Sequence, residues 1–244
     1  MRVAAGESLV LLGANGSGKS TLLKLLGGLL FAQRGSVRAF GTELTPDALT
    51  REDFRRRFRR TVGLMFQNSE SQLFTTSVWD EVAFGPLQLG LPEEAVAGRV
   101  ADCLRLVGLT GLEGRPPHRL SGGEKKKLAL AAVLAVNPAV LLLDEPTGGL
   151  DPRSQHFLVG LLRRLHRSGR TIVTATHHLD IVPEIADRVR VFGEDHRLLA
   201  GGAPRDVLRD RDLLLAANLV SEDYHVHDHE HCAHGHYHSH RHGH

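Results

Sequence analysis

The stretch GANGSGKS at residues 13–20 decides the fold. It fits G-x-x-x-x-G-K-[S/T], follows an apolar run (ESLVLL, residues 7–12) and opens a helical pattern at residues 19–30. Its glycines let the backbone fold around an anion, with consecutive N–H groups and a helix N-terminus aimed at phosphate oxygens. Lys19 would reach the β- and γ-phosphates of a nucleotide, and Ser20 would offer its hydroxyl to Mg²⁺. The predicted phosphate-binding residues are Gly13, Ala14, Asn15, Gly16, Ser17, Gly18, Lys19, Ser20 and Thr21.

A second motif, VLLLDEPT at residues 140–147, ends an apolar run in two carboxylates. In an open α/β sheet, ligands bind at the carboxyl edge of the strands. We therefore expect Asp144 to hold Mg²⁺ and Glu145 to polarise an attacking water. Phosphoryl transfer needs mainly positioning and neutralisation of charge, which these residues supply together with the phosphate loop.

Strand-like runs alternate with helical patterns along the rest of the chain. Further strands are expected at 62–67, 140–143, 171–176, 189–192 and 197–199, and helices at 122–136 and 152–167. Between 77 and 108 the helical patterns are interrupted at Gly85-Pro86 and Leu91-Pro92. The alternation predicts an α/β protein with a mainly parallel sheet. Together with the phosphate-loop motif at 13–20, this arrangement resembles the P-loop NTPase (RecA-like) core. The helix-only stretch at about 68–137 is expected to be a helical subdomain inserted in a domain that spans residues 1–220.

Composition narrows the function classes. The formal net charge is +2 with histidine neutral, which argues against a nucleic-acid binder. The one basic cluster, RRRFRR at 55–60, is interpreted as a solvated helix face or loop. Two cysteines form no disulfide framework, which favours a reducing compartment. The beginning of the chain has no signal-peptide pattern, and the apolar runs are shorter than a membrane helix requires.

Further motifs resemble one family. LSGGE at 120–124 resembles the signature motif of ATP-binding-cassette (ABC) ATPases. Gln67 resembles their Q-loop glutamine, GLD at 149–151 their D-loop, and His177 their switch histidine. The order and spacing match from about residue 3 to 220. This resemblance implies that two cassettes pair head to tail, as a homodimer or a heterodimer, with ATP and Mg²⁺ between them.

The resemblance also implies roles for the motif residues. Ser121, Gly122 and Gly123 would contact the γ-phosphate bound by the opposite cassette. His177 would contact the γ-phosphate within its own site, and Gln67 would sense Mg²⁺ and water. The implied catalytic set is Glu145, His177 and Gln67, and the implied Mg²⁺ set is Ser20, Gln67 and Asp144.

The segment VGLMFQNSESQLFTTSVWDEVAFGPLQLGLP at 62–92 narrows the resemblance. It resembles ATPase subunits of energy-coupling-factor transporters, especially those for cobalt or nickel. Members of that group commonly have arginine where Lys127 stands and aspartate where His178 stands. The resemblance implies transmembrane partner subunits, a position at the cytoplasmic face of the membrane, and a groove lined by residues 74–84 that receives a helix of a membrane subunit.

The last 24 residues, 221–244, form a histidine-rich tail for which the sequence predicts no fixed structure. Neutral imidazole is a ligand for Ni²⁺, Co²⁺ and Zn²⁺, so we expect several exchangeable metal sites there, with Cys232 as a softer ligand. A purification tag and a merely solubilising tail are the alternatives. The candidate ligands are His225, His227, His229, His231, His234, His236, His238 and His240.

One departure and several alternatives stay open from the sequence. Members of the family begin earlier, with a strand carrying an aromatic residue that stacks on adenine, whereas no aromatic residue here precedes Phe31. Either the start lies upstream or the chain is truncated. The leading function is ATP-driven import of nickel or cobalt. The alternatives are an ABC ATPase of a zinc or vitamin importer, a soluble non-transport ABC ATPase, and a metal-storage protein.

Overall fold

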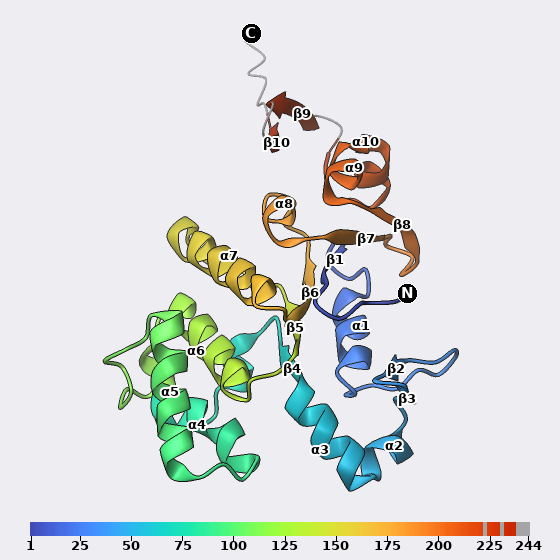
Figure 1. Cartoon of the computed structure of the whole chain (residues 1–244). Helices are drawn as coiled ribbons and strands as arrows, with labels where there is room; N and C mark the ends of the chain where they lie inside the picture. Colours follow the sequence, from blue (N-terminus) through green and yellow to red (C-terminus); the bar gives the residue numbers. More distant parts are fainter. Residues whose placement is uncertain (222–223, 230–231, 238–244) are drawn as a thin grey trace.

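The computed structural model describes residues 1–221, 224–229 and 232–237. Its centre is a six-stranded sheet of order β4-β5-β6-β1-β7-β8 (Figure 1). All neighbouring strands run parallel except β7 and β8, which pair antiparallel. The mainly parallel sheet predicted from the sequence is thus confirmed. The strands are β1 Ser8–Leu12, β4 Val62–Met65, β5 Val140–Asp144, β6 Thr171–Thr176, β7 Arg188–Phe192 and β8 Leu198–Gly202.

Both faces of the sheet are covered by helices, which explains why its inner strands are apolar throughout. Side chains alternate along a strand, so Leu9 and Leu11 pack with Leu23 of α1 (Lys19–Leu26), whereas Val10 and Leu12 join the larger core on the other face. That larger core includes α7 (Pro152–Arg167), which lies across the sheet from α1 (Figure 1). Because each face is dry, β1 is fully buried along its whole length.

Between β4 and β5 the described chain forms helices and no strand. They pack beside the sheet rather than on its centre, with α4 and α5 against α6 (Figure 1). The extent of the inserted subdomain, about 68–137, remains our prediction. The elements are η1 Ser69–Gln72, α4 Val78–Gln88, α5 Glu93–Val107, η2 Pro117–Arg119 and α6 Gly122–Ala135.

The expected interruption at Gly85-Pro86 is wrong, because α4 continues through both residues to Gln88. Pro86 lies in the last turn, so its missing N–H removes a single late hydrogen bond. Gly85 serves packing instead: a Cβ there would lie 2.6 Å from Val136 Cγ2. The glycine is present because α4 approaches the α6 region too closely for a side chain.

The remaining elements surround this core. A short hairpin, β2 Arg38–Ala39 and β3 Thr42–Glu43, and two helices, α2 Pro46–Thr50 and α3 Glu52–Thr61, precede β4. The basic run at 55–60 lies on α3, in agreement with the helix interpretation. After β6 come α8 Val182–Ile185, α9 Pro204–Arg209 and α10 Arg211–Ala216. No helix in the part of the chain that the structure describes is long and apolar enough to cross a membrane.

The tail departs from the expectation of no fixed structure. It forms an antiparallel hairpin of β9 Tyr224–His229 and β10 Cys232–Tyr237. The physical reason is the period-two sequence, since strict alternation is the pattern of a strand. His231, His238 and His240 lie outside the described residues.

Candidate nucleotide site

Four strand ends bring the predicted residues to one edge of the sheet. The register aligns Leu12 with Thr176 and Met65 with Leu143, and Asp144 with Ala175. The phosphate loop, Gln67, Glu145 and His177 each follow one of these strand ends directly or within two residues. Parallel strands therefore collect residues from distant parts of the sequence at a single carboxyl edge, as expected.

A cavity of about 210 Å³ lies at this edge. Its lining unites the loop with the two carboxylates and the glutamine. The lining residues are Asn15, Gly16, Ser17, Gly18, Lys19, Ser20, Thr21, Gln67, Asp144 and Glu145. Of the predicted phosphate-binding residues only Gly13 and Ala14 do not line it, and both contribute carbonyl groups to the loop behind it.

The conformation of the loop explains its glycines. Gly16 and Gly18 have φ of +83° and +95°, in the region that L side chains avoid. A Cβ at Gly13 would lie 2.7 Å from Ser17 Oγ and 2.9 Å from the Phe192 carbonyl oxygen, so the close approach of β7 excludes any side chain there. These conformations and the close approach at Gly13 explain why glycine occupies the three positions.

Lys19 is buried against its own loop. Its Nζ donates to the carbonyl oxygens of Gly13 (2.7 Å) and Ala14 (2.9 Å). Burial lowers the pKa of this amine, while the negative charges of Glu145 and Asp144 raise it in part. The ammonium is therefore held at the cavity by carbonyl dipoles and two nearby carboxylates, a position from which it can turn to an anion.

Asp144 is suited to a divalent cation. Its Oδ1 is buried and has no hydrogen-bond partner. Burial raises the pKa of this carboxyl, and the hydrogen bond from the Ser20 side chain opposes that shift. A buried carboxylate oxygen without a donor, next to a serine hydroxyl, is a donor set that fits Mg²⁺, which prefers oxygen ligands.

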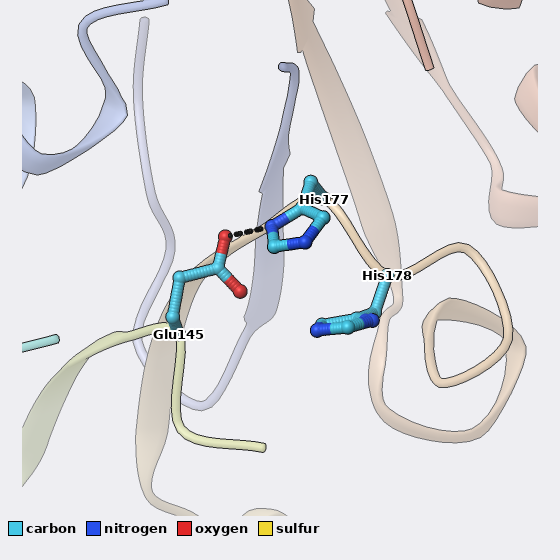
Figure 2. A group of neighbouring side chains, drawn as sticks. All are labelled: Glu145, His177 and His178. Atoms are coloured by element: carbon cyan, nitrogen blue, oxygen red, sulfur yellow. Dashed lines mark hydrogen bonds and ion pairs between the residues drawn. The ribbon is translucent and has the colours of Figure 1, made fainter. Parts of the chain in front are cut away.

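Glu145 is held in an unusual backbone conformation. Its φ is +45°, although it is not glycine, and its N–H donates to the Ala175 carbonyl. The residue is 4% exposed. Thr176 Oγ1 donates to Oε2 at 3.0 Å. His177 Nδ1 lies 2.7 Å from Oε1, the contact that Figure 2 shows. Both carboxylate oxygens are thus fixed by groups at the end of β6, and such locally strained residues concentrate at functional sites.

Lys126 supports this turn and was missed from the sequence. From α6 its Nζ donates to the Glu145 carbonyl at 2.9 Å and also to the Gly148 carbonyl. Desolvation by burial lowers the pKa of its amine. The motif LSGGEKKK offers three consecutive lysines, and nothing in the sequence separates them. Only packing of α6 selects the middle one.

Gln67 is exposed and lines the cavity from the loop after β4. Two further residues that sequence reasoning missed hold this loop. Gln72 accepts from the Phe66 N–H at 2.8 Å and donates to the Leu64 carbonyl at 3.3 Å. Glu81, 4% exposed, accepts from the N–H groups of Phe74 (3.1 Å) and Thr75 (3.0 Å). The path from Gln67 to α4 is therefore tied down at both ends.

The predicted signature residues Ser121, Gly122 and Gly123 are not among those that line the cavity. Ser121 is instead the N-cap of α6. Its Oγ accepts from the Glu124 N–H at 3.3 Å, and Glu124 Oε2 accepts from the Ser121 N–H at 2.8 Å. The helix N-terminus beside it is exposed. One chain thus presents a phosphate cavity and, separately, an exposed helix N-terminus.

A model of the ABC transporter family matches residues 1–148, more than half of the chain. The chain belongs to this ABC transporter family. The nickel import ATP-binding protein NikO of Rhodobacter capsulatus is 51% identical over 218 residues, which cover 88% of this chain and 85% of that protein.

Two solved structures of ABC proteins resemble the fold. The structure of cbiO1 from Clostridium perfringens, described as part of the ABC transporter complex cbiONQ, has a TM-score of 0.75 and 36% identity, and the match covers 90% of this chain and 86% of that one. The dimeric ATP-binding cassette MJ0796 bound to ADP and Pi has a TM-score of 0.76 and 25% identity, with coverage of 84% and 88%. As an ABC ATP-binding subunit, the chain is an ATP hydrolase that powers transport.

Proposed function

We propose that this chain is the ATP-binding subunit of a membrane importer for a transition-metal ion, nickel or cobalt. The observation that carries the ATPase part is the cavity that unites the phosphate loop with Asp144, Glu145 and Gln67. The metal part is supported by the likeness to a nickel import protein and by ten histidines in the last twenty residues.

The residues of the cavity divide the chemistry between them. The loop N–H groups and the Lys19 ammonium bind the phosphates of ATP. The Ser20 hydroxyl, the Asp144 carboxylate and Gln67 would hold Mg²⁺, which would supply neutralisation of phosphate charge. Glu145 orients and polarises the attacking water, because its two oxygens are fixed by Thr176 and His177.

The second half of the site comes from another cassette. The exposed N-terminus of α6, with Ser121, Gly122 and Gly123, is free to contact the γ-phosphate of a facing subunit, since it has no part in its own cavity. The dimeric form of the related cassette MJ0796 supports this arrangement. ATP then favours the closed pair because it contacts both subunits only in that state.

A groove beside the Q-loop is suited to a helix of a membrane subunit. It has a volume of about 240 Å³ and lies between β4, α4 and α6. Phe74 and Phe84 line it with 66% and 43% of their surfaces exposed, and their rings meet edge to face at 4.9 Å. Such exposed aromatic residues mark interaction surfaces. The groove supports our proposal that the chain is a peripheral protein at the cytoplasmic face of the membrane.

The tail is proposed to hold exchangeable Ni²⁺, Co²⁺ or Zn²⁺. The register sets His227 opposite His234, His225 opposite His236, and His229 opposite Cys232. Opposite and alternate positions of an antiparallel pair share one face. The backbone register therefore pairs histidine or cysteine positions across the two strands, and imidazole and thiolate are ligands for soft and borderline ions.

Uptake of labelled ions tests the proposal. Uptake of labelled Ni²⁺ and of labelled Co²⁺ is measured in cells that carry this chain with its membrane subunits, and in matched cells that carry the Glu145→Gln variant. Uptake that is lost in the variant supports a metal importer driven by this site, and the preferred ion names the cargo. If neither Ni²⁺ nor Co²⁺ is taken up while the purified chain hydrolyses ATP, nickel and cobalt are rejected as cargo in favour of zinc, a vitamin or a non-transport role. Deletion of residues 221–244 should weaken uptake only at low metal concentration.

A further inference from the structure

Glu145 shares its position with two imidazoles that come from consecutive residues. His177 and His178 follow β6, and their rings lie 4.2 Å apart at an interplanar angle of 32°. One ligand atom from each histidine and one from the Glu145 carboxylate all lie within 4.8 Å of one another (Figure 2). The proposed ATP hydrolysis uses Glu145 and His177, whereas the side chain of His178 has no role in it.

Two imidazoles and one carboxylate form a ligand set for a divalent transition ion. Nitrogen and oxygen ligands lie about 2.0–2.2 Å from such an ion, so ligand atoms around it are at most about 4.4 Å apart. The observed ligand atoms lie within 4.8 Å of one another, so at most about 0.4 Å of closure is needed to bring them around one ion. Three protein ligands would leave further coordination positions for water.

The site is open to an ion in the single chain. The His177 side chain is 38% exposed, whereas the Glu145 side chain is 5% exposed, so solvent reaches the His177 imidazole more readily than the carboxylate. Mg²⁺ is a poor competitor here because it prefers oxygen ligands, and the oxygen-rich position beside Ser20 and Asp144 is suited to it. Imidazole nitrogen therefore selects transition ions at this second position.

We propose that Ni²⁺, Co²⁺ or Zn²⁺ binds Glu145, His177 and His178 and thereby stops ATP hydrolysis. A bound ion takes the carboxylate oxygen that would polarise water and the His177 Nδ1 that now contacts that carboxylate. Metal accumulated on the cytoplasmic side would then slow the subunit that drives its import. This regulatory meaning rests on the proposed function; the binding site itself does not.

The test uses the full-length chain in which the ten tail histidines are replaced by asparagine, so that tail binding does not hide the site. Co²⁺ is added without nucleotide, and its visible absorption reports nitrogen and oxygen ligation. ATP hydrolysis at saturating Mg²⁺ and ATP is then titrated with Ni²⁺ and Zn²⁺. We expect a Co²⁺ spectrum that differs from that of the aqueous ion, and inhibition by both metals.

His178→Phe keeps a ring against His177 but removes the ligand atom, and His178→Asn provides a second, smaller replacement. The backbone N–H of residue 178, which donates to Thr176 Oγ1, is retained in both. Hydrolysis without added metal should stay within about twofold, and the half-inhibiting metal concentration should rise at least about tenfold. His178→Cys should restore inhibition, because thiolate binds these ions. His156→Phe, at an exposed position of α7, is the matched control.

An unchanged half-inhibiting concentration in His178→Phe and His178→Asn, or a Co²⁺ spectrum equal to that of the aqueous ion, overturns the inference. Failure of the uptake experiment with Co²⁺ still bound at this site would discard the metal cargo and keep the site. Uptake without Co²⁺ bound here would keep the importer and discard the site.

Discussion

Lys126→Met isolates the support of the Glu145 turn. The substitution keeps most of the apolar stem and removes the ammonium that donates to the carbonyl oxygens of Glu145 and Gly148. Neither carbonyl contacts ATP in the proposed mechanism. Any loss of hydrolysis must therefore come from movement of the turn that carries the Glu145 carboxylate.

The expected size follows from two opposing terms. A hydrogen bond to a charged donor contributes about 1.5–3 kcal/mol, and water at this half-buried position replaces much of the two that are lost, which leaves about 2 kcal/mol. The φ of +45° at Glu145 stores a cost of about 1–3 kcal/mol. The tether and the strain are thus of similar size, so the turn should relax when the tether is removed. A penalty of 2 kcal/mol corresponds to about a 30-fold lower kcat.

The assay is steady-state hydrolysis by the purified chain, with kcat and KM for ATP determined separately and Glu145→Gln as the background. KM should change little, because the phosphate loop is untouched. Lys125→Met and Lys127→Met are matched controls on the same helix: Lys125 pairs with Glu70 at 3.1 Å, and Lys127 lies over the Phe157 ring. A kcat for Lys126→Met within twofold of wild type, or an equal loss in the controls, would refute the reasoning.

Three further outcomes are expected. Gly85→Ala should lower the free energy of unfolding by about 1–3 kcal/mol, since the new methyl group meets Val136 Cγ2 at 2.6 Å. Gly98→Ala in α5, where the space is open, should raise the free energy of unfolding by about 0.5–1 kcal/mol. Urea titration measures both changes. Burial raises the pKa of the Asp144 carboxyl above its ordinary value of 3.8. Without Mg²⁺ the chain should therefore lose stability relative to Asp144→Asn as pH rises from 3.8 through the raised pKa. Urea titrations of both chains across this pH range test the trend, and a constant difference in stability would contradict it. Glu81→Ala leaves the N–H groups of Phe74 and Thr75 without their acceptor, so proteolysis within residues 73–77 should accelerate about tenfold, while the affinity for ATP stays unchanged. An unchanged cleavage rate argues against a role of Glu81 in holding this loop.

Local signals carried much of the fold. The helix Pro152–Arg167 and the strand Thr171–Thr176 occupy the residues predicted for them, because Asp151 caps the helix, Pro152 starts it and β-branched residues fill the strand. The phosphate loop was predictable because its motif, with the required glycines, lies in one short stretch of sequence. The interruption predicted at Gly85 was wrong, because this glycine allows close packing against Val136, about fifty residues away in the sequence.

The supporting residues of the site could not be predicted in this way. Gln72 and Glu81 are ordinary polar residues in the sequence, and their roles depend on where β4 and α4 place them. Lys126 is one of three lysines in a row, selected only by the direction in which α6 presents it. Sequence motifs marked the groups that face the cavity, whereas the groups that hold them are defined by tertiary structure.

Two close contacts between a glycine and a valine also constrain how this chain can evolve. A Cβ at Gly63 would lie 2.6 Å from Val133 Cγ1, as one at Gly85 would from Val136 Cγ2. At each pair a larger residue is accommodated only after the valine has become smaller, because the cavity left by a lost methyl group is milder than the overlap of two side-chain carbons at 2.6 Å. The order of the two mutations is therefore fixed, and related chains should gain bulk at 63 or 85 only in lineages that had already lost it at 133 or 136.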